Sequence, residues 1–390
     1  MSSSHVSLSP NAALEWKDGK RYLWLLGLVV PVFPFLSGAL VAVTGSEWGW
    51  WFGPLVLYTV IPLMDRLIGG DRFNPPEEVV DALSKEKYYR YCVYAFVPLH
   101  YLGLIWAMYL LTSGSMGWVG SIGLVATIGI VSGVAFNTAH ELGHQNSAFE
   151  MWMSKIALAP TFYGHFVVEH NRGHHVRVAT PEDPASARYG ESYWAFLPRT
   201  MAGGLKSAWS IERKRLARSN KSVWHWQNHN LQAWGLSVLL YAGLIAAFGW
   251  AVLPFVLAQS IYSMTLFEVI NYLEHYGLCR QKNASGRYER CQPEHSWNSN
   301  HLVTNLLLYQ LQRHSDHHAN PTRSYQALRH FEDVPQLPSG YAGMVPLAYI
   351  TPLWRRVMDA KVRAHYGGDL SLANIDPRLK KQGIGVLKSE

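Results

Sequence analysis

Long stretches without a charged residue limit most strongly what this chain can fold into. Such stretches cover residues 23–43, 48–64, 91–111 and 118–138, and a longer one over 233–270 contains a single charge, Glu268. A bilayer core of about 30 Å is crossed by about 20 apolar residues in a helix. We therefore predict six membrane-spanning helices, arranged as three hairpins, at residues 23–43, 48–68, 91–111, 118–138, 231–248 and 251–270.

The predicted fold is all-α, an integral membrane protein with a helical cap on one side. The alternative is a soluble protein with buried core helices, but uncharged stretches of this length seldom occur there. Charged residues make up only 16% of the chain, whereas soluble domains contain about a quarter. We expect a polar N-terminal segment over 1–20, a single membrane-embedded catalytic domain over 21–376 and a polar tail or linker over 377–390.

Positive charges are distributed on one side only. All 34 Lys and Arg residues lie before the first apolar stretch, in the segments 65–90 and 139–232, or after residue 270. The tips of the three hairpins, at 44–47, 112–117 and 249–250, contain none. Loops rich in Lys and Arg stay in the cytoplasm, so both termini and both long segments are predicted to be cytoplasmic. The net charge of +7 then reports topology and attraction to anionic lipid rather than binding of nucleic acid.

Histidine residues form three clusters in the predicted cytoplasmic segments. In a helix, residues four apart share one face, so His140 and His144 can hold one metal ion. His170 and His174 repeat this spacing, and His175 is expected to point toward a second metal. A third cluster places three histidines on one face, and one more follows the sixth span: His314, His317, His318 and His275.

Nine histidines are more than one zinc ion can use, because zinc takes at most four ligands in a structural site. They fit two metal ions with about four or five nitrogens each. Imidazole binds iron, copper, nickel and zinc, so the ligand type alone does not name the metal. The three cysteines are scattered without a C-x-x-C pair, and we expect no cysteine-based site.

Two other functions compete with a two-metal enzyme. The segment His140–His144 also matches H-E-x-x-H, the signature of zinc proteases with Glu141 as the general base. That function leaves the other seven histidines unexplained, and Glu141 is better placed as a hydrogen-bond acceptor for a ring N–H. A metal transporter would place its ligands near the middle of the bilayer, whereas these histidines lie at or outside its edge.

The chain resembles the membrane-bound alkane 1-monooxygenases, a bacterial non-haem di-iron family related to fatty-acid desaturases and hydroxylases. The resemblance extends from about residue 20 to about residue 376. Three histidine clusters alone indicate only the superfamily, and the segments 271–278 and 311–318 narrow it to alkane hydroxylases. The stretches that carry the resemblance are 137–144, 163–175, 271–278, 296–301 and 311–318.

The resemblance implies two iron ions bound by His140, His144, His170, His174, His175, His275, His314, His317 and His318. It also implies terminal hydroxylation of medium- to long-chain n-alkanes with O₂ in the bacterial inner membrane. Rubredoxin, itself reduced by an NADH-dependent rubredoxin reductase, is then the electron donor. The sequence lacks the cysteine pairs of a fused rubredoxin, so the donor is expected to be either a separate protein or a domain that lies outside this sequence. Desaturation or hydroxylation of fatty acyl chains, or oxygenation of aromatic side chains, remains the alternative within the superfamily.

Further side chains are predicted to support such a site. Glu141, Glu268, Asn271, Glu274, Asp183 and Asp316 are candidates for orienting imidazole rings by hydrogen bonding, although Asp183 suits a structural cap equally well. By resemblance, Leu57 occupies a position that limits the length of the substrate. His100 either lines the substrate tunnel or forms a hydrogen bond between helices. Gly120, Gly123, Gly129 and Gly133 are expected to allow close helix contact.

Overall fold

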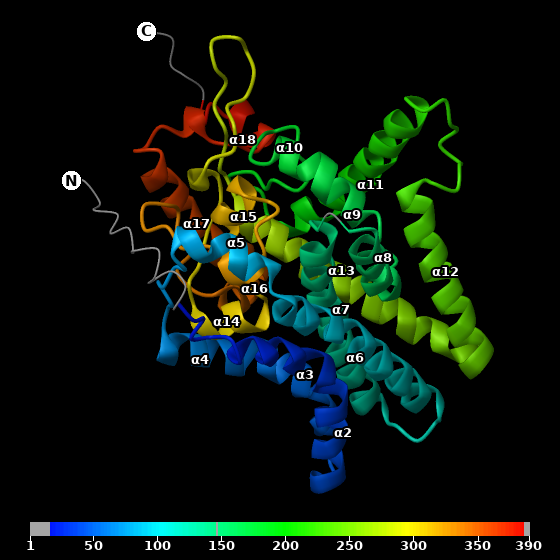
Figure 1. Ribbon diagram of the computed structural model, residues 1–390. Helices are drawn as coiled ribbons and strands as arrows, with labels where there is room; N and C mark the ends of the chain where they lie inside the picture. The colour runs from blue at the N-terminus through cyan, green and yellow to red at the C-terminus, as the bar shows by residue number, and fades with distance from the viewer. Residues whose placement is uncertain (1–15, 146, 386–390) are drawn as a thin grey trace.

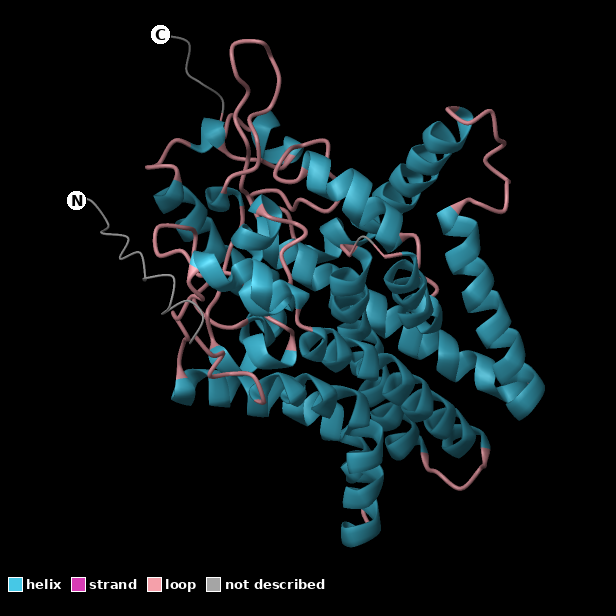
Figure 2. Ribbon diagram, in the orientation of Figure 1, coloured by secondary structure: helices cyan, strands magenta, loops and turns pink. Residues whose placement is uncertain are grey.

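Helices dominate the architecture of the chain. The computed structural model describes residues 16–145 and 147–385, and within these ranges only isolated β-bridges occur outside helices and loops. Figure 2 shows this all-helical arrangement, with the loops gathered mainly on one side of the molecule. The predicted all-α fold is confirmed. Residues 1–15 of the predicted N-terminal segment and residues 386–390 of the predicted tail lie outside the described part.

Six helices are long and apolar enough to cross a membrane, as predicted. The fourth and sixth helices continue five residues or so beyond the predicted spans, and the added turns carry His140 and His275. The polar side chains of these added turns are tolerated because they pack against the cap and do not face lipid. The six helices are Leu23–Thr44, Glu47–Ile68, Lys87–Thr112 (α6), Trp118–Gly143 (α7), His229–Phe248 (α12) and Trp250–His275, of which Leu253–His275 is α13.

The first two spans are irregular. The first consists of a 3₁₀ segment, Leu23–Val32, followed by α2, Phe33–Thr44, with Pro31 and Pro34 near the junction. Proline lacks an N–H and clashes with the preceding turn, which breaks regular α-helical hydrogen bonding. Figure 1 shows α2 running steeply away from the second span. That second span is assembled from four short pieces: Glu47–Trp51, α3 (Phe52–Leu55), the π-helical Val56–Val60 and α4 (Ile61–Ile68).

Helix α7 lies at the centre of the bundle and packs most extensively against α13. Its glycines permit the close contact that the sequence predicts. A Cβ atom on Gly129 would lie 2.5 Å from Cδ1 of Tyr262, and one on Gly133 would lie 2.9 Å from Cδ2 of Leu266. Real Cβ atoms do not approach so closely, so a larger residue at Gly129 would require Tyr262 to move, and one at Gly133 would displace the end of the flexible Leu266 side chain.

Shorter helices form a cap where α7 and α13 end (Figure 1). The cap brings together segments that lie far apart in the sequence, and it supplies most of the histidines. Its principal helices are α5 (Glu77–Lys85), α8 (Ala148–Leu158), α9 (Phe166–Glu169), α10 (His175–Arg177), α11 (Tyr193–Ala217), α14 (Leu302–Leu307), α15 (His314–Ala319), α16 (Tyr341–Tyr349) and α17 (Thr351–His365).

The close packing of α7 on α13 can be tested with a larger side chain. We expect Gly129→Leu to destabilise the protein by about 1–3 kcal/mol, because the added side chain overpacks the contact with Tyr262. Gly243→Leu on α12 is the matched control, since a Cβ atom there meets no heavy atom within 4 Å. Thermal unfolding in detergent measures both variants. Equal melting temperatures would contradict the proposed role of Gly129.

Candidate metal centre

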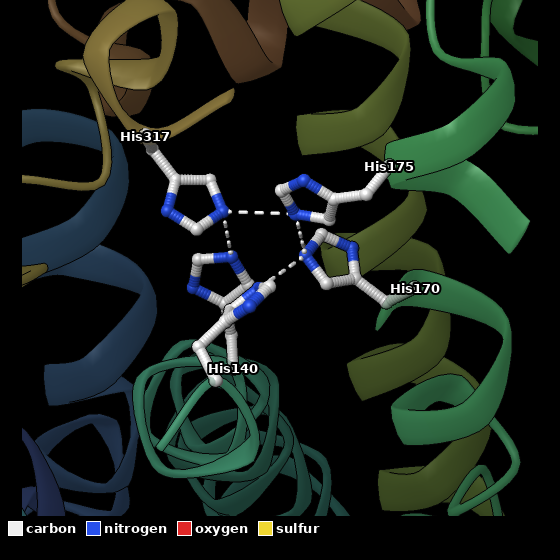
Figure 3. A group of neighbouring side chains, drawn as sticks. His140, His170, His175 and His317 are labelled. Carbon is white, nitrogen blue, oxygen red and sulfur yellow. Dashed lines mark hydrogen bonds between the residues drawn. The ribbon is translucent and has the colours of Figure 1, made fainter. Parts of the chain in front are cut away.

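Four segments bring the nine histidines together. His140 and His144 end α7, and His275 ends α13. The segment from α9 through α10 contributes three histidines, and α15 contributes the other three. Figure 3 shows rings from three of these segments facing one another across a common centre.

The ring nitrogens form two separate groups. His140, His144, His170, His175 and His317 make up the first, and His174, His275, His314 and His318 make up the second. Within each group the potential ligand atoms lie within 4.8 Å of one another. In the first group, neighbouring Nε2 atoms are 2.9 Å apart for His140 and His317, 3.1 Å for His144 and His170, and 3.0 Å for His170 and His175. In the second group, the corresponding distances are 2.9 Å for His314 and His318 and 3.1 Å for His275 and His314.

These distances fit metal coordination. Two nitrogens bonded at right angles to one metal ion, each at about 2.1 Å, lie about 3.0 Å apart. Five nitrogens in the first group exceed the tetrahedral set of a structural zinc site. The structure therefore offers two groups, of five and four nitrogens, each of which could hold a metal ion.

The pairing of the histidines differs from the prediction at one helix. His170 and His174 were expected to share a metal, but His170 joins His175 in the first group while His174 belongs to the second. The reason is that His170–His174 forms a π-helical turn. A π-helix bonds residues five apart instead of four, which brings positions 170 and 175 to one side.

The cluster on α15 is also divided between the groups. His314 and His318, four residues apart, contribute to the second group, whereas His317 faces the first. The prediction had placed all three on one face. Helix α15 therefore lies between the two groups and contributes to both.

Burial keeps most of these rings neutral. Removal from water lowers the pKa values of His170, His175, His314, His317 and His318 well below the ordinary range, and neighbouring rings add to this shift. Burial also lowers the pKa of His144 to about 3. A neutral imidazole retains the lone pair that a metal ion needs, so the site is prepared for cations without first losing protons.

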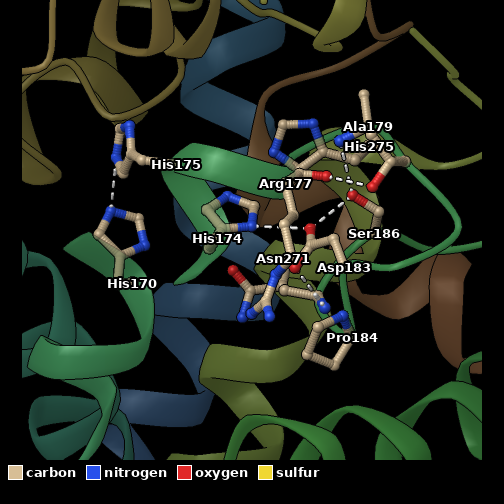
Figure 4. A network of polar contacts seen from close by, with 12 residues as sticks. His170, His174, His175, Arg177, Ala179, Asp183, Pro184, Ser186, Asn271 and His275 are labelled. Carbon is tan, nitrogen blue, oxygen red and sulfur yellow. Dashed lines mark hydrogen bonds and ion pairs between the residues drawn. The ribbon is translucent and has the colours of Figure 1, made fainter. Parts of the chain in front are cut away.

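Asp183 holds His174 in position, as the sequence predicts. Its Oδ2 atom lies 2.9 Å from Nδ1 of His174 and accepts a hydrogen bond of 2.6 Å from the hydroxyl of Ser186 (Figure 4). Burial acts to lower the pKa of His174, but the Asp183 carboxylate outweighs it and raises this pKa. The Nδ1–H···carboxylate contact leaves Nε2 of His174 free for a metal. Similarly, Nδ1 of His275 donates to the carbonyl of His295 at 3.1 Å, a partner that no sequence pattern indicated.

Glu274 lies beside the second group. Its Oε2 atom is 3.3 Å from Nε2 of His314, and its Oε1 atom accepts a hydrogen bond of 3.1 Å from the hydroxyl of Tyr341. Tyr341 was not singled out by the sequence, because it reaches the site from α16, far along the chain. Glu274 therefore contacts a histidine as predicted, but at the nitrogen that faces the metal position.

The predictions for Glu141, Asp316 and Glu268 as partners of imidazoles are wrong. Glu141 accepts a hydrogen bond from the backbone N–H of Tyr325 at 3.4 Å, and Asp316 binds the backbone and side chain of Arg329. Glu268 accepts bonds from Tyr163, Thr200 and Asn271, so Asn271 supports a carboxylate and not a ring. The direction of Glu141 also weighs against the zinc protease, in which this carboxylate must face the metal-bound water.

An apolar cavity of about 920 Å³ ends at the two histidine groups. Its lining comes from four of the spans and from α14 and α16, and it includes Leu57. The histidines that close it are His140, His170 and His314. The cavity is lined mainly by hydrocarbon side chains, which suits an apolar ligand.

His100 does not line this cavity, which corrects its assignment to the tunnel. Its Nε2 atom lies 2.9 Å from the hydroxyl of Ser132, which in turn donates to Gln259 at 2.7 Å. The amide of Gln259 donates to the carbonyl of Pro160 at 2.6 Å. His100 thus belongs to a polar network that joins α6, α7 and α13, the helix–helix hydrogen bond that the sequence offered as the alternative.

Comparisons with known proteins identify the family. Residues 116–348 match the family model described as fatty acid desaturase. The alkane 1-monooxygenase of Acinetobacter baylyi is 47% identical over 94% of this chain and 91% of its own length, and that of Pseudomonas putida is 47% identical over 96% and 93%. A xylene/toluene monooxygenase hydroxylase component of Pseudomonas putida is 29% identical over 55% of the chain and 57% of its own length. The chain belongs to the alkane 1-monooxygenase family, as its resemblance implied.

The role of Asp183 can be tested through metal affinity. We expect Asp183→Asn to weaken retention of metal in the second group by about tenfold, because loss of the carboxylate weakens the bond that orients His174. Asp316→Asn is the matched control, since that carboxylate binds Arg329 and no histidine. Competition with a chelator, followed by elemental analysis, measures the loss. The assignment fails if both variants release metal alike.

Proposed function

We propose that this protein hydroxylates the terminal carbon of medium- to long-chain n-alkanes to 1-alkanols, using O₂ and two electrons from reduced rubredoxin. The balanced reaction is RH + O₂ + 2e⁻ + 2H⁺ → ROH + H₂O. The observation that carries this proposal is the apolar cavity of about 920 Å³ that ends at His140, His170 and His314. The relatives named alkane 1-monooxygenase support the same activity.

Iron is the proposed metal in both histidine groups. Imidazole is a good ligand for iron, although it also binds zinc, copper and nickel, and a pair of redox-active ions would supply the activation of O₂ that attack on a C–H bond requires. The protein's own part is to keep the nine rings in place. Asp183 and the carbonyl of His295 fix two of them through Nδ1.

The cavity selects its substrate by its shape and by its apolar lining. An alkane offers no polar group, so its recognition depends on apolar contact along its length. The histidines lie at one end of the cavity, and only the tip of an inserted chain would reach them. This arrangement accounts for oxidation at the terminal carbon, because the inner carbons stay against the hydrocarbon walls.

The lining also distinguishes an alkane from an acyl substrate. Among the described residues, no Lys or Arg lines the cavity, whereas an acyl chain attached to a charged carrier or headgroup would need a counter-charge. Oxygenation of aromatic side chains finds less support, since the relative with that activity in its name is 29% identical over 55% of the chain. Both alternatives predict different products from the assay below.

Electrons are proposed to enter at the first histidine group. His144 and His175 are half-buried, whereas the other seven ligands are buried, so a docked carrier would approach these two rings most closely. The segments that carry the histidines also carry the Lys and Arg residues. By the positive-inside rule these segments lie on the cytoplasmic side of the inner membrane. A soluble cytoplasmic rubredoxin would meet the site there.

The product assay tests the proposal directly. Membranes containing the protein, a rubredoxin and its reductase are supplied with octane or hexadecane under ¹⁸O₂. We expect 1-alkanol carrying one ¹⁸O atom, detected by mass spectrometry, because one atom of O₂ enters the product. Protein loaded with two iron ions that yields no labelled alkanol from any n-alkane would refute the proposal.

Leu57 offers a test of how the cavity measures chain length. We expect Leu57→Trp to shift the preferred substrate to shorter alkanes, because the larger side chain fills part of the cavity. Leu55→Trp is the control, since Leu55 lies on the same span with 52% of its surface exposed and is not part of the lining. The octane-to-hexadecane product ratio reports the shift. An identical ratio in both variants would show that Leu57 does not set the length.

A further inference from the structure

A second, smaller cavity, with about 340 Å³ of empty space including its opening to solvent, reaches the same centre from another direction. It lies between α9, α11 and α13, and His170 and His174 connect it to both histidine groups. Unlike the substrate cavity it is lined largely by polar side chains: Tyr163, His165, Glu169, Thr200, Glu268 and Asn271. We call it the polar chamber. Figure 4 shows Pro184 and Asn271, two residues of its wall, close to His174.

Glu268 is the buried acid of this chamber, and 2% of its surface is exposed. Three uncharged donors hold its carboxyl group: the hydroxyl of Tyr163 at 2.7 Å, the hydroxyl of Thr200 at 3.1 Å and the amide of Asn271 at 3.1 Å. Among the described residues, no Lys or Arg forms an ion pair with it. Because no fixed cation holds its charge, this carboxyl group is suited to take up and release a proton.

His165 indicates that the chamber holds water. Its side chain is buried, and neither ring nitrogen has a hydrogen-bond partner in the described part of the chain. Burial lowers the pKa of His165 to about 4, so the ring is neutral and presents one donor and one acceptor. Buried polar atoms without a protein partner are normally satisfied by ordered water. The ring lies against Tyr163, with 4.3 Å between centroids, so such water would lie close to the side chain that donates to Glu268.

An ion pair links the chamber to the surface. Glu169 accepts a hydrogen bond of 2.8 Å from Arg177, which also donates to the hydroxyl of Ser207 at 2.7 Å. The Arg177 side chain is 29% exposed, whereas that of Glu169 is 9% exposed. Polar groups therefore continue from solvent through Arg177 and Glu169 into the chamber.

The proposed reaction needs such a route. Each turnover consumes two protons together with two electrons, while the C–H bond and the electron donor are oxidised and O₂ is reduced. The substrate cavity is lined mainly by hydrocarbon and cannot conduct protons. We propose that the polar chamber is a water-filled entrance for protons and that Glu268 carries them toward the histidine groups. This inference rests on the proposed function.

Footprinting with hydroxyl radicals generated in place by X-rays tests the water without using enzymatic activity. Radicals formed from bound water modify buried side chains next to it. We expect modification of Tyr163 and His165 despite their burial, and none of Tyr241, whose hydroxyl is bonded to the carbonyl of Pro160. Unmodified Tyr163 and His165 would overturn the proposal.

Filling the chamber with hydrocarbon provides the first variant. A Cβ atom on Gly204 would meet only Cγ of Glu169, at 3.8 Å, so Gly204→Leu extends into the chamber while improving helix propensity on α11. We expect it to reduce the footprint at Tyr163 several-fold and to divert electrons from alkanol to hydrogen peroxide. Gly235→Leu on α12 is the control, because its Cβ meets no heavy atom within 4 Å, and it should resemble the natural chain in both measurements.

Glu268→Gln removes the proton carrier and keeps the shape. We expect alkanol formation to fall about a hundredfold, the usual contribution of a positioned acid, while peroxide release per electron rises and the metal content is unchanged. Glu150→Gln is the control, since Glu150 is equally buried but lies outside the chamber. A merely structural role of Glu268 would lower activity without changing the ratio of alkanol to peroxide.

The outcomes separate this inference from the proposed function. If Gly204→Leu and Glu268→Gln both retain metal and the natural ratio of alkanol to peroxide, the chamber does not supply protons. If Glu268→Gln loses its metal, the ratio of alkanol to peroxide in Gly204→Leu decides whether the chamber supplies protons. If the natural chain makes no alkanol, the proposed function fails, whereas the footprint still shows whether the chamber contains water.

Discussion

The structure depends on how the nitrogen lone pairs of neutral imidazole rings can face one another inside a protein. Nine imidazole rings from four segments point inward, with neighbouring Nε2 atoms about 3 Å apart. Two lone pairs at that distance repel, and burial prevents most of the rings from becoming protonated. Cations between the rings resolve both difficulties, since metal binding and folding of such a site are coupled. The convergence of α7, α10, α13 and α15 on one place therefore suits the binding of metal ions.

Around this centre the protein separates dry surfaces from wet ones. The substrate cavity meets the histidines with hydrocarbon walls on one side, and the polar chamber meets them with Glu268, Tyr163 and His165 on another. The two share Phe166, His170, Phe267 and Asn271, so a few side chains form the partition. Such a division lets one site accept an insoluble substrate while remaining in contact with water, which bulk solvent in a single open cleft would not allow.

Sequence reasoning succeeded where a structural feature depends on residues that are close together in the sequence. The exclusion of charge from a bilayer is read residue by residue, and it located all six membrane-length helices. Metal-ligand spacing likewise found eight of the nine histidines in the two groups, and His275 was found from its place at the end of the sixth span. It failed where the partner comes from a distant segment: Glu141 binds Tyr325 and Asp316 binds Arg329. For His100 the sequence left two roles open, and the structure shows the hydrogen bond between helices and not the tunnel. The pairing of His170 with His175 failed for a different reason, because α-helical periodicity does not describe a π-helical turn.

The π-helical turn limits which insertions and deletions the segment can tolerate. A π turn is an α-helix that accommodates one additional residue, so the segment His170–His174 holds a residue that an ordinary helix would not need. Deleting any one non-histidine residue there would restore the regular α-helical count. His170 and the histidine now numbered 175 would become four apart, and the residue now numbered 174 would turn away from the second group. The number of residues in this short segment thus decides which histidine nitrogens belong to which group, and a single codon gained or lost would change that distribution without replacing any histidine.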